Sequence, residues 1–306
     1  MFPGELRAFH AVVQAGSIRK ASRALGVAPS SVSRQVALLE HQMGTELLRR
    51  TAGGVVLTHA GTLVADYARS VVLDYDSLRG DLNDLRGRRR LIRVAAVESS
   101  ISGGLIQALA EFRSKFERVV FRVKMTPALD IVDEVKRGEC DVGLGFCVQP
   151  HPDINTVARI PEPIVLVVPS DHALAQAQSV TIRDLKGLSL ALPDLNFGIR
   201  RIFDRASHDI GLESGLTPAL TTNTFEAMRD FVRCGGGAAV LPRRAAMNAQ
   251  EMTRLAAIPI EGEEFAQTTI DIVTLRKQRT ARIVSSFIEQ LLRTFSANVP
   301  VARHSA

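Results

Sequence analysis

Two short helical patterns meet at a glycine within residues 17–36, and they constrain the fold of this chain more than any other stretch. The first pattern begins at Ser17, whose hydroxyl is expected to cap the free amides of a helix. Its apolar face is formed by Ile18, Ala21 and Leu25. Gly26 then stops it, and Pro29 opens a second helix, because a first helical turn tolerates a residue without an N–H. The apolar face of that helix consists of Val32, Val36 and Leu39. The stretch therefore predicts a helix-turn-helix.

The outer face of the second helix carries polar side chains near its N-terminus. It comprises Ser30, Ser31, Ser33, Arg34 and Gln35. Small hydroxyls can bond to phosphates or bases without holding a helix out of the groove, and an arginine can fork onto guanine. These residues are candidates for binding double-stranded DNA, and Ser17, Arg50 and Thr58 are added to them. The alternative is a solvated helix face, because helix pairs with a glycine break occur in many other proteins.

The segment after the second helix helps to decide between DNA binding and a solvated helix face. It reads as a helix end, a stop at Gly44 and a small β-hairpin, or wing, before Thr58. At this point the chain resembles the LysR-type transcriptional regulators. The matching positions are Leu6, Phe9, Gly16, Ser17, Ala21, Leu25, Val32, Ser33, Leu39, Glu40, Gly44, Leu47, Arg50, Leu57, Thr58, Ala60 and Gly61. The chain departs from the family at Ser22, where an alanine is usual, and at Ala28–Pro29, where a Ser–Gln pair is usual. The family's base preference therefore does not carry over.

The resemblance carries expectations for the whole protein. It implies a regulator that binds promoter DNA as a dimer or a dimer of dimers, that is, a homotetramer, and that contacts RNA polymerase. It also implies a C-terminal α/β effector domain with the fold of type-2 periplasmic binding proteins, whose two subdomains flank a cleft for a small-molecule effector. No cofactor is expected besides that effector.

A long helix is predicted from about Gly61 to Arg86, with apolar residues that alternate at spacings of four and three. This heptad seam comprises Val64, Ala68, Val71, Tyr75, Leu78, Leu82 and Leu85. One chain would bury so narrow a stripe poorly, so the seam predicts pairing with a second helix. Packing against its own domain is the alternative. The resemblance implies antiparallel linker helices that pair two subunits.

The net charge of +6 is concentrated near the N-terminus. Residues 1–90 carry 13 Lys+Arg against 8 Asp+Glu, whereas the remainder carries 25 against 24. A local basic excess suits phosphate contact. A hinge is predicted at Gly87–Arg90, where either a solvated linker or phosphate contact would explain the basic run. We expect a winged helix-turn-helix domain, all-α apart from its wing, over residues 1–58, a linker helix over 59–87 and an effector domain over 88–306.

Beyond the hinge, segments with strand and helix periods alternate. Strands are expected at residues 91–97, 119–125, 141–146, 164–168, 188–192, 219–221, 238–241 and 270–275, and helices at 103–116, 129–137, 200–210, 225–234 and 280–295. The order strand, helix, strand, helix, strand predicts a parallel sheet. Following the resemblance, residues about 91–161 and 269–306 form one subdomain, and residues about 162–268 form the other.

Polar side chains follow several of the expected strands. Ligands of open α/β folds sit at the carboxyl ends of strands, near helix N-termini. This rule singles out Ser99, Ser100, Ser102, Thr126, Phe146, Asn196, Phe197, Thr222 and Asn223 as candidate effector-binding residues. The hydroxyls could cap their own helices instead. No cluster of positive charge is assigned to the cleft.

An enzyme of the same two-lobed architecture is the competing class. The sequence contains no Gly-x-Ser-x-Gly, no His-Glu-x-x-His and no phosphate loop. His151, His172 and His208 have no partner in the sequence that would make any of them a general base. We therefore predict no catalytic residue. The alternative function is a two-lobed solute-binding or catalytic protein whose helix-turn-helix serves protein contacts.

The three cysteines, Cys140, Cys147 and Cys234, have no metal-ligand spacing, and their odd number argues against a disulfide framework. Reduced thiols and no metal site are expected, with a redox-sensing pair as the alternative. The N-terminus lacks the pattern of a signal peptide, and no apolar run approaches ~18 residues. A cytoplasmic protein without membrane contact is expected.

Overall fold

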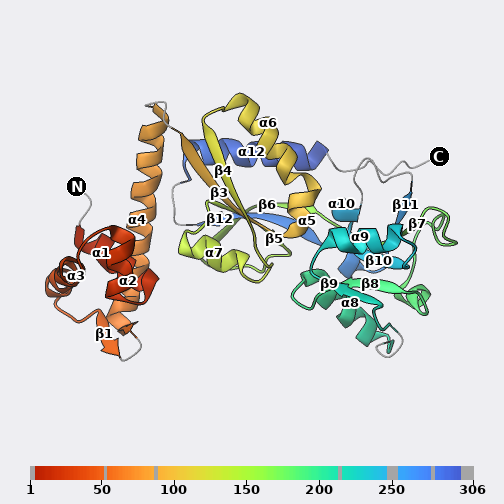
Figure 1. Ribbon diagram of the computed structural model, residues 1–306, viewed down its shortest axis with the longest axis horizontal. Helices are drawn as coiled ribbons and strands as arrows, with labels where there is room; N and C mark the ends of the chain where they lie inside the picture. The colour runs from red at the N-terminus through yellow and green to blue at the C-terminus, as the bar shows by residue number, and fades with distance from the viewer. Residues whose placement is uncertain are drawn as a thin grey trace. The chain divides into compact units, whose positions relative to one another are not determined.

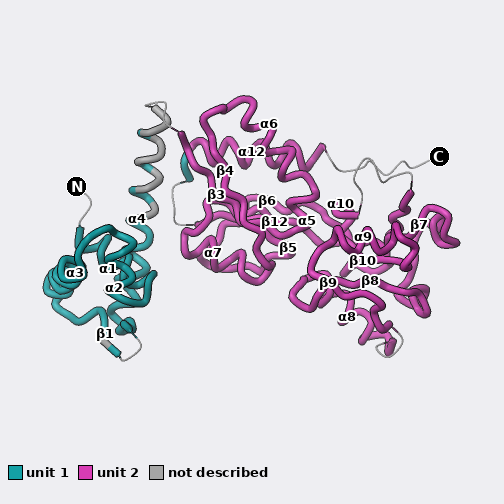
Figure 2. Tube along the Cα trace, viewed as in Figure 1, with its two compact units in different colours: residues 1–86, 277–281 teal, residues 87–276, 282–306 magenta. Residues whose placement is uncertain are grey.

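The structure is a computed structural model that describes residues 4–51, 54–85, 89–212, 216–246, 254–276 and 280–297. The chain divides into two compact units, residues 1–86 with 277–281 and residues 87–276 with 282–306 (Figure 2). Gly87 and Arg88 of the predicted hinge lie outside the described residues, as does the tip of the predicted wing at residues 52 and 53.

Unit 1 contains three short helices, a two-stranded hairpin and one long helix (Figure 1). They are α1 (Gly4–Ala15), α2 (Ile18–Leu25), α3 (Pro29–Met43), β1 (Leu48–Thr51), β2 (Gly54–Leu57) and α4 (His59–Leu85). Their buried core consists of Leu6, Ala8, Phe9, Val12, Ala21, Val32, Val36, Leu39, Leu47 and Ala68. The predicted apolar faces of α2 and α3 supply part of this core, so the helix-turn-helix is confirmed.

The turn between α2 and α3 follows the predicted residues, with one exception. Gly26 ends α2 with a left-handed φ of 66°, a conformation that a residue with a side chain adopts at a cost. Pro29 occupies the first position of α3. Ser17 precedes α2 in an extended conformation, but its side chain makes no capping hydrogen bond. The prediction that its hydroxyl caps the helix is therefore wrong.

Unit 2 is built on two five-stranded sheets. The first has the order β4 (Val119–Met125), β3 (Arg90–Ala96), β5 (Val142–Phe146), β12 (Thr269–Leu275), β6 (Ile154–Pro161). The second has the order β11 (Leu255–Pro259), β7 (Ile164–Pro169), β10 (Ala238–Pro242), β8 (Leu190–Pro193), β9 (Leu220–Thr222). The strands β3, β4 and β5 are parallel as predicted, whereas β12 runs antiparallel to both of its neighbours. The two-sheet α/β fold class is confirmed, although β6 and β11 were not predicted.

Helices connect and cover the two sheets (Figure 1). They are α5 (Glu98–Ser100), η1 (Ile101–Leu105), α6 (Ile106–Lys115), α7 (Ile131–Arg137), η2 (Ile182–Leu185), α8 (Gly198–Asp209), α9 (Phe225–Arg233), α10 (Arg243–Ala246), α11 (Glu263–Ala266) and α12 (Arg282–Ala297). α6 and α12 pack together, and the buried rings of Phe112 and Phe287 meet edge to face there, with centroids 5.4 Å apart.

The chain crosses between the sheets after β6 and again before β12, and the two crossings are joined by hydrogen bonds between Glu162 and Thr268. The Glu162 amide donates to the Thr268 carbonyl at 2.8 Å, and the Thr268 hydroxyl donates back to the Glu162 carbonyl at 2.5 Å. The Glu162 carboxylate is fully buried and accepts the backbone N–H of Arg244 at 2.8 Å. The Arg244 guanidinium Nε lies 2.8 Å from Oε2 of the same carboxylate. Burial is the larger influence and raises the pKa of Glu162 to about 7.

Candidate functional site

The outward face of α3 presents an arginine and two serines. Ser30, Ser31 and Arg34 are exposed, whereas Ser33 and Gln35 are half-buried. Ser30 and Arg34 are four residues apart and therefore share one face of the helix. The Gln35 side chain is turned inward, because its Oε1 is buried and lies 3.4 Å from where a Cβ at Gly4 would stand. The exposed set thus narrows to Ser30, Ser31 and Arg34.

Thr58 stands at the start of α4 rather than free on the wing. Its hydroxyl accepts the backbone N–H of Gly61 at 2.9 Å and donates to the Glu46 carbonyl at 2.8 Å. The first of these bonds satisfies an amide that the first turn of a helix leaves without a partner. This geometry accounts for Thr58 as a helix cap. The Arg50 side chain, another candidate, lies outside the part of the chain whose side chains are described.

The wing is held by Glu40, whose role the sequence analysis does not identify. Its Oε1 accepts the backbone N–H groups of Leu47 and Leu48, at 2.8 and 3.0 Å. Gly61 packs against the same loop so closely that a Cβ would lie 1.9 Å from the Leu47 carbonyl oxygen. Glu40 and Gly61 are both among the positions that match the family, and that match could have indicated their structural role.

The predicted seam of α4 divides into two parts. Ala68 is fully buried, and Val64 and Val71 pack against the core of unit 1. The first half of α4 therefore packs against its own domain, which was the alternative to pairing with a second chain. Further along, Tyr75, Leu78 and Leu82 are exposed, and the side chain of Leu85 lies outside the description. Two exposed residues that the heptad pattern missed are Leu63 and Tyr67. The exposed apolar stripe of α4 comprises Leu63, Tyr67, Tyr75, Leu78 and Leu82.

A cavity of about 200 Å³ opens in unit 2 where strand ends of both sheets meet helix N-termini. Its lining residues are Val97, Glu98, Ser99, Met125, Thr126, Pro127, Ala128, Phe146, Asp194, Asn196, Phe197, Gly198, Ile199, Asn223 and Phe225. They lie at or just after the ends of β3, β4 and β5 in one sheet and of β8 and β9 in the other. Among the predicted residues, the structure brings together Ser99, Thr126, Phe146, Asn196, Phe197 and Asn223.

Three predicted residues do not line the cavity. Ser100 is fully buried, and its hydroxyl has no hydrogen-bond partner among the described residues. Ser102 is exposed and donates to the Glu98 carbonyl at 3.1 Å. The Thr222 hydroxyl accepts the Thr224 amide at 3.4 Å. The rule of strand ends locates the right loops, but it cannot tell which successive residue of a tight turn faces inward.

Glu98 is the main residue of the cavity that the sequence analysis missed. Its Oε1 accepts the backbone N–H of Phe225 at 2.7 Å, so a carboxylate from the β3 side caps the first turn of α9. Its Oε2 is buried and has no hydrogen-bond partner among the described residues. Burial raises the pKa of Glu98, while the Phe225 N–H and the charge of Arg229 act in the opposite direction. Glu98 directly precedes the predicted Ser99, so its place after β3 was the available signal.

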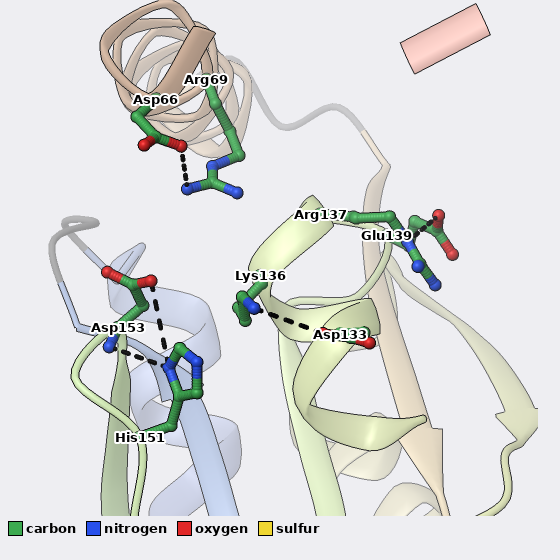
Figure 3. Close-up of polar contacts among 8 residues, drawn as sticks. All are labelled: Asp66, Arg69, Asp133, Lys136, Arg137, Glu139, His151 and Asp153. Carbon is green, nitrogen blue, oxygen red and sulfur yellow. Dashed lines mark hydrogen bonds and ion pairs between the residues drawn. The ribbon is translucent and has the colours of Figure 1, made fainter. Parts of the chain in front are cut away.

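The histidines and cysteines form no reactive cluster in the part of the chain that is described. Figure 3 shows the His151 ring turned toward Asp153, whose backbone N–H donates to its Nδ1 at 3.2 Å. The His172 Nδ1 accepts the Leu174 N–H in the same way. Burial raises the pKa of the Cys140 thiol to about 12, so it stays protonated. The described residues include no group of histidine, cysteine or acidic side chains that could hold a metal ion.

None of the described helices combines the length and apolar character needed to span a bilayer.

Two family models match the chain. The model described as bacterial regulatory helix-turn-helix protein, lysR family, matches residues 3–62. The model described as LysR substrate binding domain matches residues 85–296.

Individual relatives cover nearly the same span. An uncharacterised HTH-type transcriptional regulator of Mycobacterium bovis is 31% identical over 264 residues, which cover 82% of this chain and 84% of the relative. The RuBisCO operon transcriptional regulator of Allochromatium vinosum is 26% identical and covers 84% of this chain and 85% of its own length. Among solved structures, full-length OxyR of Pseudomonas aeruginosa has a TM-score of 0.69 at 19% identity and covers 95% of this chain and 94% of that chain. Full-length CbnR complexed with its target DNA has a TM-score of 0.55 at 21% identity and covers 96% of this chain and 100% of that chain.

Proposed function

The chain belongs to the LysR family of transcriptional regulators, and we propose that it binds promoter DNA through α3 and holds a small-molecule effector in the cavity of unit 2. It has the helix-turn-helix and the effector-binding domain of that family. The observation that carries the proposal is the cavity itself, which joins polar strand-end residues of two sheets in a chain that also presents an exposed arginine on a helix-turn-helix.

The DNA contact is assigned to Arg34, Ser30 and Ser31. These side chains are exposed on the first half of α3, the part of a recognition helix that meets base edges. No capping side chain covers the start of α3, since Ala28 precedes it. The solved CbnR structure, which contains its target DNA, supports the proposal that this chain binds DNA.

The oligomer is assigned to the exposed apolar stripe of α4. A stripe of leucine and tyrosine side chains left in water is stabilised by a partner helix, because burial removes its apolar surface from water. We propose that two chains pair through this stripe, and that two such pairs form a dimer of dimers on DNA. Contact with RNA polymerase belongs to the same proposal.

We also propose that the protein catalyses no reaction. The cavity lining has no histidine, cysteine or lysine, and among the described residues no hydrogen bond joins its Ser99 or Thr126 hydroxyl to Glu98 or Asp194 as a nucleophile and its base. A ligand held there can act by its different affinity for two arrangements of the protein. The cavity is thus proposed as a sensor site.

Substitutions that separate the two sites test the proposal. We expect Arg34→Ala to weaken selective binding to the DNA flanking the protein's own coding region while leaving ligand binding intact. The pair Ser99→Ala and Thr126→Ala should have the opposite effect, with operator affinity near that of the wild type and a weakened response to a ligand. Gel shifts read the first property and calorimetry the second. If either folded variant lost both DNA binding and ligand binding, the proposal of two separate sites would be contradicted.

A further inference from the structure

We propose that the effector of this protein is a small amine whose protonated ammonium group binds beside the carboxylate of Glu98, within the aromatic wall of the cavity. This inference rests on the proposed function, because it names the chemical class of the ligand that the cavity would sense. It rests on three features of the described lining: its charge, the free oxygen of Glu98 and the arrangement of its phenyl rings.

The charged residues that line the cavity are both acidic. They are Glu98 and Asp194, and no lysine, arginine or histidine stands among the described lining residues. Asp194 uses Oδ1 to accept the Leu195 N–H at 2.6 Å. A carboxylate ligand would face two carboxylates in a partly enclosed space, where charge repulsion is stronger than in water. An ammonium ligand would be attracted by both.

Glu98 supplies the specific contact. One carboxylate oxygen is already used on the Phe225 amide, and Oε2 is left buried without a partner among the described residues. A buried charged oxygen without a hydrogen bond is costly, and a donor with positive charge offsets that cost best. An N–H group of an ammonium ion meets this need, whereas a ligand carboxylate offers only acceptors.

Aromatic rings complete the site. Phe146, Phe197 and Phe225 line the cavity, and the last two meet edge to face with centroids 5.3 Å apart. Phenyl faces attract a cation within about 6 Å of the ring centroid, and the effect grows when the cation is desolvated. The combination of carboxylate and phenyl rings therefore fits an amine with an apolar body.

The N-terminus of α9, one of those at the cavity, argues less for an anion than its position implies. The first amide of α9 is bonded to Glu98, and the Ala227 amide is bonded to the Thr224 side chain. Arg229 interacts with Glu226 and donates to the Ala245 carbonyl, and it does not line the cavity. The protein's own carboxylate thus occupies the place at α9 where an anionic ligand would bind.

The size of the cavity limits the ligand. A volume of about 200 Å³ is below the roughly 300–1,000 Å³ of pockets for drug-sized ligands. A ring or short alkyl chain with one amino group is the expected scale, and 2-phenylethylamine is a suitable probe.

The test is a calorimetric titration of the full-length protein with three probes of similar skeleton: 2-phenylethylamine, phenylacetate and 2-phenylethanol. We expect the amine to bind at least about tenfold more tightly than either other probe. Glu98→Gln keeps an acceptor for the Phe225 N–H but removes the charge, and it should weaken amine binding about tenfold or more while leaving 2-phenylethanol unchanged. The matched control is Glu139→Gln, which removes the same charge from the surface ion pair with Arg137 (Figure 3).

Three results would overturn the inference: phenylacetate binding as tightly as the amine, unchanged amine binding in Glu98→Gln, or no binding of any probe at millimolar concentration. The selectivity among probes is measured on the wild type, so it decides the matter even if the variant does not fold. Preference for phenylacetate would reject the ligand class and leave the regulatory proposal standing. That proposal fails separately, by the absence of selective DNA binding.

Discussion

The guanidinium of Arg34 and the hydroxyl of Thr58 differ in what surrounds them, and that difference assigns their roles. Arg34 is exposed on α3. The Thr58 hydroxyl, in contrast, accepts the Gly61 N–H and donates to the Glu46 carbonyl. A side chain that hydrogen-bonds to nearby backbone groups in this way stabilises the fold and is not available for DNA. A long exposed cation near the start of a recognition helix is placed for DNA.

Arg34→Ala should weaken binding to the specific operator by ~1–3 kcal/mol, because a forked contact to a base or phosphate is removed. The matched control is Arg113→Ala, which removes an exposed arginine from α6 in unit 2. Fluorescence anisotropy with labelled operator DNA measures both. An affinity of the folded Arg34→Ala protein equal to that of the control would show that α3 meets DNA through another face.

Thr58→Ala should lower the free energy of unfolding of unit 1 by ~1 kcal/mol, because the helix loses its cap. Thr58→Ser retains the hydroxyl and should remain close to the wild type. Urea unfolding of the full chain, followed by circular dichroism, gives the comparison. If both variants are equally stable but Thr58→Ala alone binds DNA poorly, the hydroxyl is a DNA ligand and the assignment as a cap is wrong.

Glu162 should make stability depend on pH. Its pKa is raised to about 7 in the folded protein, from 4.5, so the folded state favours the protonated form. The stability that it contributes is fully present below about pH 4.5 and is lost as the pH rises through about 7. At 1.36 kcal/mol per pKa unit, the loss between pH 5 and pH 8 is at most about 3 kcal/mol.

Glu162→Gln should remove this part of the pH dependence, although it also weakens the crossing by leaving Arg244 without its carboxylate. The comparison is the slope of unfolding free energy between pH 5 and pH 8, with Glu139→Gln as the control for a surface carboxylate. A slope in Glu162→Gln that matches the wild type would mean that Glu162 titrates in its ordinary range.

At the scale of single elements, α4 serves two surfaces along its length. Its first half contributes Ala68 to the core of unit 1 and packs Val71 against that core, and its second half leaves Leu78 and Leu82 exposed. A heptad pattern records where apolar residues recur, but it does not record whether the partner belongs to the same chain. The pattern therefore predicted the helix, but it could not separate the apolar residues that pack within unit 1 from those that are exposed.

Two substitutions with aspartate separate these surfaces. Leu78→Asp should dissociate the paired subunits and leave unit 1 folded, because it places a charge in the exposed stripe. Val71→Asp should instead destabilise unit 1, by several kcal/mol, since it buries a charge in the core of the same chain. Thr62→Asp adds a charge to an exposed position of the same helix outside the stripe. Sedimentation velocity distinguishes the outcomes, and an unchanged mass for Leu78→Asp would reject the stripe as the interface.

Burial separates most of the predicted strands from the missed ones; the exception is the edge strand β4, which was predicted although it is only partly buried. The strands β3, β5, β7 and β10 are largely buried runs and were readable as strands, whereas β6 alternates buried and exposed residues at the edge of its sheet. Its polar residues Asn155, Thr156 and Arg159 interrupt the apolar ones, so no continuous apolar run marks it as a strand. The cleft loops were found because parallel strands end at one edge, yet the inward residue of each loop depends on turn geometry that sequence periodicity does not carry. For this reason Ser99 lines the cavity and Ser100 does not.

At the scale of the whole molecule, the family assignment joins a DNA-binding unit to a ligand-binding unit in one chain. Residues 1–90 hold most of the net positive charge, so phosphate contact is expected from that part alone. The sensor function requires that occupancy of the cavity in unit 2 changes how the chain acts on DNA. That coupling is a property of the assembled protein on DNA, and no single residue reveals it.

The most direct measurement is an anisotropy titration of the full-length protein on duplex DNA from the region flanking its own coding sequence. A shuffled duplex of equal length serves as the competitor, at two salt concentrations. We expect selective binding that weakens as salt rises, because phosphate contacts release counterions. That selectivity should be reduced in Arg34→Ala and kept in Glu98→Gln. Equal affinity for the flanking and the shuffled duplex, at both salt concentrations, would contradict the account.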